Sequence, residues 1–190
     1  MFKVPTSQTV FELVEKRSRF ITYCDAITNE QDFKHFLQRL KLQYPDARHF
    51  CYGFRIGPAS SAHRGFSDDG EPSGTAGMPI LNVIDHSEFS NIGIIVVRYF
   101  GGTKLGTGGL SRAYSLATKT VLEKTSWQIY QPQTLITLNC DFQQEHQVRY
   151  LINQLAGNIL SVQYQQDVEL QVSISESADL SSLVQYIARL

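Results

Sequence analysis

The stretch IIVVRYFGGTKLGTGGLSRAY, residues 94–114, joins an apolar run, a glycine-rich segment and an amphipathic segment. Its first four residues are branched and apolar, which is typical of a strand buried on both faces. Five glycines follow between Gly101 and Gly109, so this segment can adopt conformations that strain other residues and can approach a ligand closely. From Leu110 onward the apolar residues recur at helical spacing. We therefore predict a strand, a glycine-rich loop and a helix.

The glycine loop supports two interpretations. Backbone amides at the positive end of a helix can hold a phosphate, but glycine clusters between a strand and a helix are often only tight connections. A P-loop frame from Gly101 to Gly106 is followed by Thr107 and Gly108 where Lys and Ser or Thr are required. A dinucleotide-binding frame begun at Gly106 has Ser111 at its third glycine position. The sequence therefore favours neither an NTPase nor a dehydrogenase.

Length and composition are those of an ordinary globular protein. The 190 residues are 42% hydrophobic, enough for one domain or two small ones. No apolar run approaches the roughly 20 residues that cross a bilayer, and the start MFKVPTSQTV contains no apolar signal segment, so we expect a cytoplasmic protein and no membrane partner. The three cysteines, Cys24, Cys51 and Cys140, are far apart and favour reduced, buried thiols.

Charge is distributed unevenly along the chain. Residues 1–126 contain 15 Lys and Arg against 12 Asp and Glu, a net charge of +3, whereas residues 127–190 contain 2 against 6, a net charge of −4. We expect two domains with these bounds. If a polyanion binds, the first domain is the electrostatically favoured side, with modest and salt-sensitive affinity.

Ahead of the glycine loop, residues 8–25 are predicted to form two extended segments around the basic turn KRSR, 16–19. An amphipathic helix is expected before Pro45. Alternating apolar residues then predict a half-buried strand that places His49 and Cys51 on one side. That pair suggests a Cys–His nucleophile, although a structural thiol beside a surface imidazole is more common and no third, orienting group can be named.

An acidic group follows within a segment of small and polar residues, 57–77. Asp68, Asp69 and Glu71 could hold Mg²⁺ or divide acid and base roles. They could equally cap a helix beginning near Thr75 and pair with a nearby arginine, for which the candidates are Arg64, Arg98 and Arg112. We favour the structural role because the spacing of a calcium-binding loop is absent. No bound metal and no cofactor are therefore expected.

The acidic second domain shows a regular pattern. Apolar spacing predicts strands at 136–140, 158–164 and 168–175, with helices at 148–155 and 180–187. This β-α-β-β-α order is that of a ferredoxin-like sandwich lacking its last strand, which leaves a sheet edge that needs protection.

Three motifs resemble a known family. DARHFCYGF (46–54), GFSDDGEPSGTAGMPIL (65–81) and VVRYFGGTKLGTGGLSRAY (96–114) occur in an order and at a spacing similar to those of the IMPACT/YigZ family, in its bacterial YigZ-like form. The resemblance implies a two-domain α+β fold. Its first domain would be similar to domain IV of elongation factor G, with a ribosomal-protein-like β-α-β arrangement, and its second to the ferredoxin-like domain V. It also implies a role in translation control or another RNA-linked process.

The leading hypothesis is a non-catalytic binding protein of translation regulation, whose first domain contacts RNA or a ribosome-associated partner. Arginine can form forked hydrogen bonds to phosphate, and Tyr99 can stack on a base. The candidates for nucleic-acid or anion binding are Arg48, His49, His63, Arg64, Arg98, Tyr99, Gly101, Gly102, Lys104, Gly106, Gly108, Gly109 and Arg112.

Two alternatives remain open. In a carboxylate- or metal-dependent hydrolase, Asp69 or Glu71 would be base or metal ligand, and Arg98 or Arg112 would stabilise charge, although no complete catalytic set is recognisable. In a pure protein–protein regulator, the Gln-rich, acidic second domain would be the contact surface.

Overall fold

The computed structural model describes residues 1–58 and 60–188 and divides into two compact units, Met1–Tyr130 and Gln131–Leu190. The last strand of unit 1, β7 (Trp127–Tyr130), pairs antiparallel with the first, β1 (Phe2–Pro5). Because of this pairing, the four residues that follow the change in charge at residue 126 lie in unit 1. Among the described residues, no helix has the length and apolarity needed to span a bilayer.

Unit 1 is built on a five-stranded antiparallel sheet with strand order β2-β3-β6-β4-β5. Its central strand is the apolar run of the sequence, in which every residue from Ile92 to Arg98 is buried. The strands are β2 (Thr9–Glu15), β3 (Ser18–Ala26), β4 (His49–Ile56), β5 (His63–Ser67) and β6 (Ile92–Tyr99).

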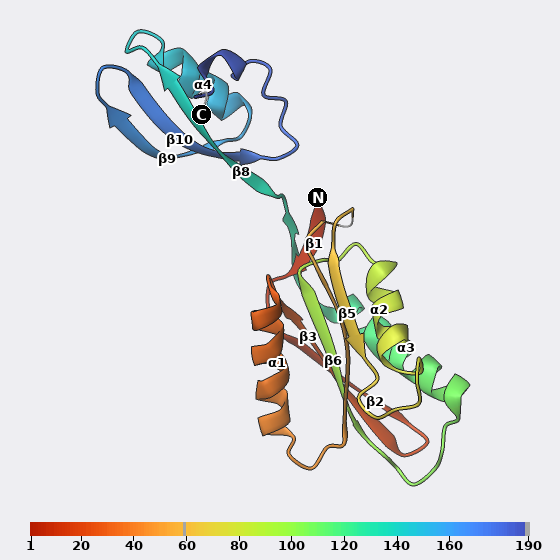
Figure 1. Ribbon diagram of the computed structural model, residues 1–190. Coiled ribbons are helices and arrows are strands. Elements are labelled where there is room, and N and C mark those ends of the chain that lie inside the picture. The colour runs from red at the N-terminus through yellow and green to blue at the C-terminus, as the bar shows by residue number, and fades with distance from the viewer. Residues whose placement is uncertain (59, 189–190) are drawn as a thin grey trace. The chain divides into compact units, whose positions relative to one another are not determined.

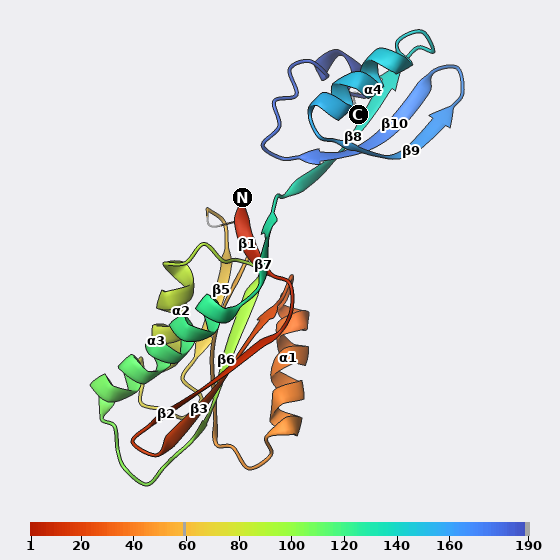
Figure 2. The same cartoon turned by 180° about the vertical axis from the view of Figure 1, so that it is seen from behind.

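Helices cover both faces of this sheet, as Figures 1 and 2 show. One face packs against α1 (Glu30–Gln43), and the other against α2 (Gly77–Asp85) and α3 (Thr107–Lys124). Alternate residues of β6 serve the two cores: Ile95 and Val97 belong to the α1 side. The predicted strand, glycine loop and helix are therefore confirmed, and the strand is buried on both faces.

Unit 2 has a three-stranded antiparallel sheet of order β8-β10-β9, packed against α4. Its elements are β8 (Gln133–Cys140), α4 (Glu145–Gln154), β9 (Asn158–Tyr164) and β10 (Val168–Ser175). Together the units confirm a two-domain α+β fold.

The predicted helix at 180–187 is wrong. The chain there makes three-residue turns, including the short 3₁₀ helix η1 (Val184–Tyr186), which bury Leu183 and Tyr186. Ile187 then forms a bridge to Leu138 on β8, so the backbone becomes extended and a helix cannot continue. Apolar residues three apart fit successive tight turns as well as they fit a helix.

Candidate functional site

Three connections meet at one end of the unit 1 sheet: the β2–β3 turn, the loop before β4 and the glycine loop after β6. Strand pairing brings them together, since Arg19 lies opposite Tyr99 and His49 opposite Arg98. Figures 1 and 2 show all three at the end of the sheet away from β1. We call this region the loop end and define it as residues 15–19, 44–49 and 98–112.

The glycine loop is packed at its start and open at its finish. A Cβ on Gly101 would lie 2.0 Å from the carbonyl carbon of Arg17, and the Gly101 amide donates to Ser18 Oγ at 3.2 Å. Gly106, with φ of +77°, instead precedes α3 as its N-cap residue, and a Cβ on Gly108 would meet no atom within 4 Å. The first glycine therefore fixes the loop on the β2–β3 turn, while Gly102, Gly106 and Gly108 leave the backbone accessible.

The N-terminus of α3 has no side-chain cap, because its capping residue is Gly106. The first hydrogen bond of the helix runs from Leu110 N to Gly106 O. Within the described part of the chain, the amides of Thr107, Gly108 and Gly109 therefore have no acceptor. These amides carry the partial positive charge of the helix end.

Behind the loop lies a buried ion pair between Arg98 and Glu71, whose side chains are only 6% and 4% exposed. Tyr114 donates to the same Glu71 oxygen at 2.8 Å, and burial is the main cause that raises the pKa of this phenol far above its usual value. Arg98 also donates to Ser18 Oγ at 3.3 Å. Arg98 thus connects Glu71 to the β2–β3 turn and to β6, and its role is structural.

The other two acidic residues also have structural partners. Asp68 accepts hydrogen bonds from the amides of Gly74, Ala76 and Gly77 and so caps α2. Burial tends to raise the pKa of Asp68, but these three bonds together lower it below its usual value. Asp69 accepts from Phe50 N at 2.7 Å. The expected capping and arginine pairing are confirmed, and no group of three potential metal ligands occurs among residues 1–58 and 60–188.

His49 and Cys51 do not form a nucleophile and base. His49 Nδ1 donates to the carbonyl of Asp69 at 2.9 Å. Cys51 Sγ donates to the carbonyl of Asp68 at 2.9 Å and lies 3.2 Å from Tyr114 OH. Burial raises the pKa of Cys51 far above its usual value, so this side chain stays a neutral thiol with a packing role.

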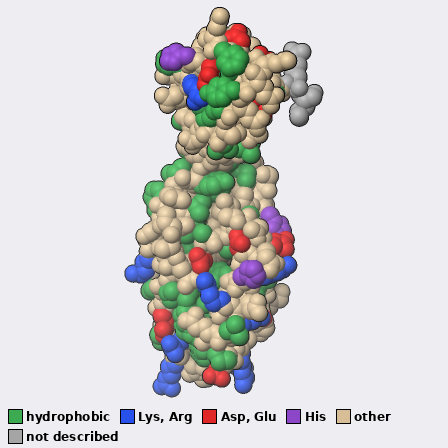
Figure 3. All heavy atoms as spheres, turned by 90° about the vertical axis from the view of Figure 1, so that its left-hand side faces the viewer, with side chains coloured by type: hydrophobic (Ala, Val, Ile, Leu, Met, Phe, Trp, Pro, Cys, Tyr) green, Lys and Arg blue, Asp and Glu red, His purple; other side chains and the backbone are tan. Residues whose placement is uncertain are grey.

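Most of the Lys and Arg side chains of unit 1 that lack an acidic partner lie at the loop end. Of the Lys and Arg side chains in the described part of unit 1, seven form no ion pair, and two of these, Lys41 and Lys124, lie over phenylalanine rings. The other five all belong to the loop end: Lys16, Arg17, Arg48, Lys104 and Arg112. Figure 3 shows basic side chains projecting from this end of unit 1.

Phe100 stands between two pockets of the loop end and is 55% exposed. The first pocket, of about 350 Å³, is lined by Asp46, Arg48, His49, Arg98, Tyr99 and Phe100. The second, of about 380 Å³, is lined by Glu71, Pro72, Arg98, Phe100, Lys104, Leu105, Gly106, Thr107 and Leu110. Phe100 was not among the residues selected from sequence, although an aromatic side chain between a buried strand and a glycine loop is a usable signal.

His63 and Arg64 are not brought together with the other candidates. His63 pairs with Ile56, at the end of β4 opposite His49, and lies 2.9 Å from a Glu30 carboxylate oxygen. Arg64 donates to Asp85 at 2.9 Å.

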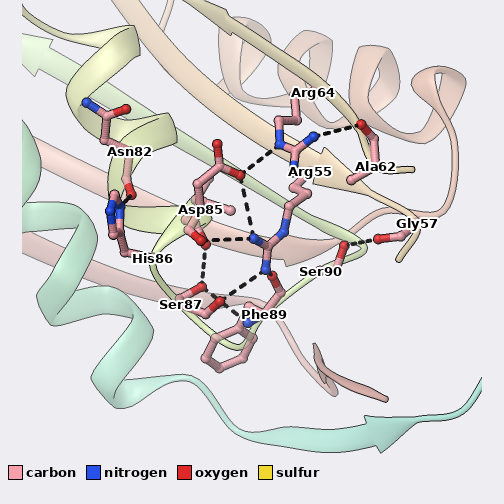
Figure 4. A network of polar contacts seen from close by, with 11 residues as sticks. Arg55, Gly57, Ala62, Arg64, Asn82, Asp85, His86, Ser87, Phe89 and Ser90 are labelled. Carbon is pink, nitrogen blue, oxygen red and sulfur yellow. Dashed lines mark hydrogen bonds and ion pairs between the residues drawn. The ribbon is translucent and has the colours of Figure 1, made fainter. Parts of the chain in front are cut away.

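Figure 4 shows that Asp85 is shared with the buried Arg55, which also donates to the carbonyls of Ser87 and Phe89. This network holds the connection between α2 and β6. Arg64 is therefore engaged in structure, at the end of the sheet away from the glycine loop.

Residues 16–122 match the family model of the Impact N-terminal domain. The chain belongs to the IMPACT family. Residues 138–183 match a domain of unknown function, DUF1949. The residues matched by the Impact model include all five Lys and Arg side chains of the loop end that form no ion pair.

Similar IMPACT family proteins cover nearly the whole chain. An IMPACT family member of Haemophilus influenzae is 42% identical over 92% of this chain and 85% of its own. IMPACT family member YigZ of Escherichia coli is 40% identical over 87% of this chain and 81% of its own. A crystal structure of a hypothetical protein aligns at a TM-score of 0.71 and 37% identity, over 91% of this chain and 84% of that chain.

Proposed function

We propose that this IMPACT family chain is a non-catalytic binding protein of translation regulation, and that the loop end of unit 1 binds the phosphate backbone of RNA, free or in a ribosome-associated particle. The proposal rests on one observation: five Lys and Arg side chains without ion-pair partners lie together at the loop end. Other Lys and Arg side chains of unit 1 have acidic or aromatic partners. Unpaired charge supplies the counterion-releasing contacts that RNA needs.

The β2–β3 turn supports this interpretation. Both its central residues, Lys16 and Arg17, have positive φ, of 47° and 65°. Two-residue turns of this kind favour Asn and Gly, because longer side chains are strained there. Strain of about 1 kcal/mol per residue is tolerated at sites where the side chains themselves are used. The free amides at the start of α3 add a second source of positive potential beside this turn.

A hydrolase is less well supported, since each carboxylate of the acidic segment is held by hydrogen bonds or by an ion pair. Asp68 caps a helix, Asp69 holds the start of β4, and Glu71 is buried against Arg98. A carboxylate that serves as a base needs an open path to its substrate.

The test compares two variants that lose equal charge. The first removes Lys16, Lys104 and Arg112 by substitution with Ala, and the matched control removes Lys34, Arg39 and Lys119, which form ion pairs elsewhere on unit 1. Binding of a labelled single-stranded RNA is measured by fluorescence anisotropy between 50 and 200 mM salt. Each phosphate contact contributes about 0.7 to the slope of log K against log salt, so the first variant should lose about 2 units of slope.

The control should keep both affinity and slope. Equal losses in the two variants, or an unchanged slope in the first, would overturn the proposal. Pull-down with and without nuclease then separates RNA binding from a protein–protein regulator, whose partner would be retained after RNA is digested.

A further inference from the structure

We infer that Phe100 makes the loop end selective for single-stranded RNA, by separating two successive bases that enter the pockets beside its ring. This inference rests on the proposed function and names the form of RNA that the same site takes. Phe100 and Arg98 line both pockets and so form their common wall.

The ring of Phe100 is held in place although it is exposed. The Arg98 guanidinium lies 5.7 Å from its centroid, and on another side 5.3 Å from that of Phe20. Arg98 is itself fixed by Glu71 and by Ser18. A ring backed by an immobile cation is a pre-organised stacking surface, because little side-chain entropy remains to be lost on binding.

Tyr99 is less suited to this task. It is only partly exposed, and the Arg19 guanidinium lies 5.7 Å from its ring centroid. Arg19 is in turn bound to Glu12 at 2.7 Å. Among the aromatic residues of the loop end, Phe100 therefore offers the more accessible surface.

The two pockets combine features that suit nucleotides. Each has a volume within the roughly 300–1,000 Å³ of small-molecule sites. The second places the apolar side chains of Leu105 and Leu110 beside Lys104 and the start of α3. The first places Arg48 and His49 beside the same Phe100. Each pocket thus offers apolar or aromatic surface for a base and a cation for the adjoining phosphate.

A double helix cannot use this arrangement. Its bases are paired and stacked inside, and the deep, narrow major groove of A-form RNA excludes side chains. A single strand can separate neighbouring bases and stack them on aromatic side chains. The cations alone would bind either form, so the preference for single strands is assigned to Phe100.

The experiment measures dissociation constants of the full chain for a 12-nucleotide oligouridine and for a 12-base-pair RNA duplex at one salt concentration. Phe100→Ala should weaken oligouridine binding about five- to hundredfold and leave duplex binding within about twofold. Phe100→Leu should behave like Phe100→Ala, and Phe100→Trp should retain the affinity. Phe66→Ala, at another exposed phenylalanine of unit 1, is the control and should change neither constant.

Equal weakening for both RNA forms, or oligouridine binding unchanged in Phe100→Ala, would overturn this inference. The salt slope of Phe100→Ala should equal that of the parent chain, because stacking releases no counterions. If the cationic variant loses binding while Phe100→Ala does not, the inference fails and the proposed function stands. If the cationic variant binds normally, the proposed function itself fails.

Discussion

The buried Arg98–Glu71 pair makes a quantitative prediction about the stability of unit 1. Glu71→Gln keeps the size of the side chain but removes its charge, and so leaves the Arg98 guanidinium buried without a counter-charge. The Gln carbonyl can still accept from Tyr114, so that hydrogen bond is retained. The variant therefore isolates the loss of the ionic partner.

The expected magnitude follows from the burial of both side chains, 94% and 96%. Removing one partner of a buried pair costs about 3–5 kcal/mol, and we expect about 3 because the hydrogen bond to Tyr114 survives. With a urea m-value of about 2 kcal/mol/M, the unfolding midpoint should fall by about 1.5 M.

The assay is urea unfolding followed by the fluorescence of Trp127. It is the single tryptophan of the chain and lies on β7, within unit 1, so its signal reports that unit. Glu12→Gln is the control, since its pair with Arg19 is solvent-exposed and should contribute far less than the buried pair.

A loss below about 1 kcal/mol in Glu71→Gln would refute the reasoning, because the pair would then behave like an exposed one. A double variant, Glu71→Leu with Arg98→Met, provides a second check. It should be less destabilised than the sum of its single variants, since it removes both buried charges together.

Three further outcomes are expected. Gly101→Ala should lower the Tm of unit 1, because its Cβ would lie 2.0 Å from the turn backbone, whereas Gly108→Ala should raise it slightly through the higher helix propensity of alanine. Cys24, whose pKa burial raises to about 12, and Cys51 should resist alkylation at pH 8 in the folded protein and react in urea, as mass spectrometry would record. The lowered pKa of Asp68 stabilises the fold above the unfolded value of about 3.9, and this contribution is lost as pH falls through the lower folded value. Acid unfolding of Asp68→Asn should therefore be less pH-dependent.

Features encoded locally were predictable from the sequence. The apolar run of β6 and the helical spacing after Leu110 determine their own structure, because each depends on neighbouring residues along the chain. The capping role of Asp68 could also be predicted, since the backbone amides that donate to its carboxylate lie just ahead in sequence. The KRSR turn between two extended segments was found for the same reason.

Features that depend on long-range pairing were not predictable. Among the described strands, β5 is an edge strand that pairs with β4, so it lacks the alternation that marks a half-buried strand, and the small and polar composition of residues 57–77 did not reveal it. β4 runs away from the glycine loop, so His63 and Arg64, which begin β5 opposite the end of β4, lie at the far end of the sheet. The pairing of Ile187 with β8 likewise replaces the second helix of unit 2.

The same reasoning explains why the glycine loop could not be understood from its composition. Gly101 permits close packing on the β2–β3 turn, whereas Gly106 and Gly108 leave the start of α3 open. Were all of them packed like Gly101, the loop would be a connection only. Because Thr107, Gly108 and Gly109 instead present free amides beside Lys104, the loop joins a rigid support to an accessible positive surface. A phosphate ligand requires this combination, since accessible amides attract it and the support keeps them oriented.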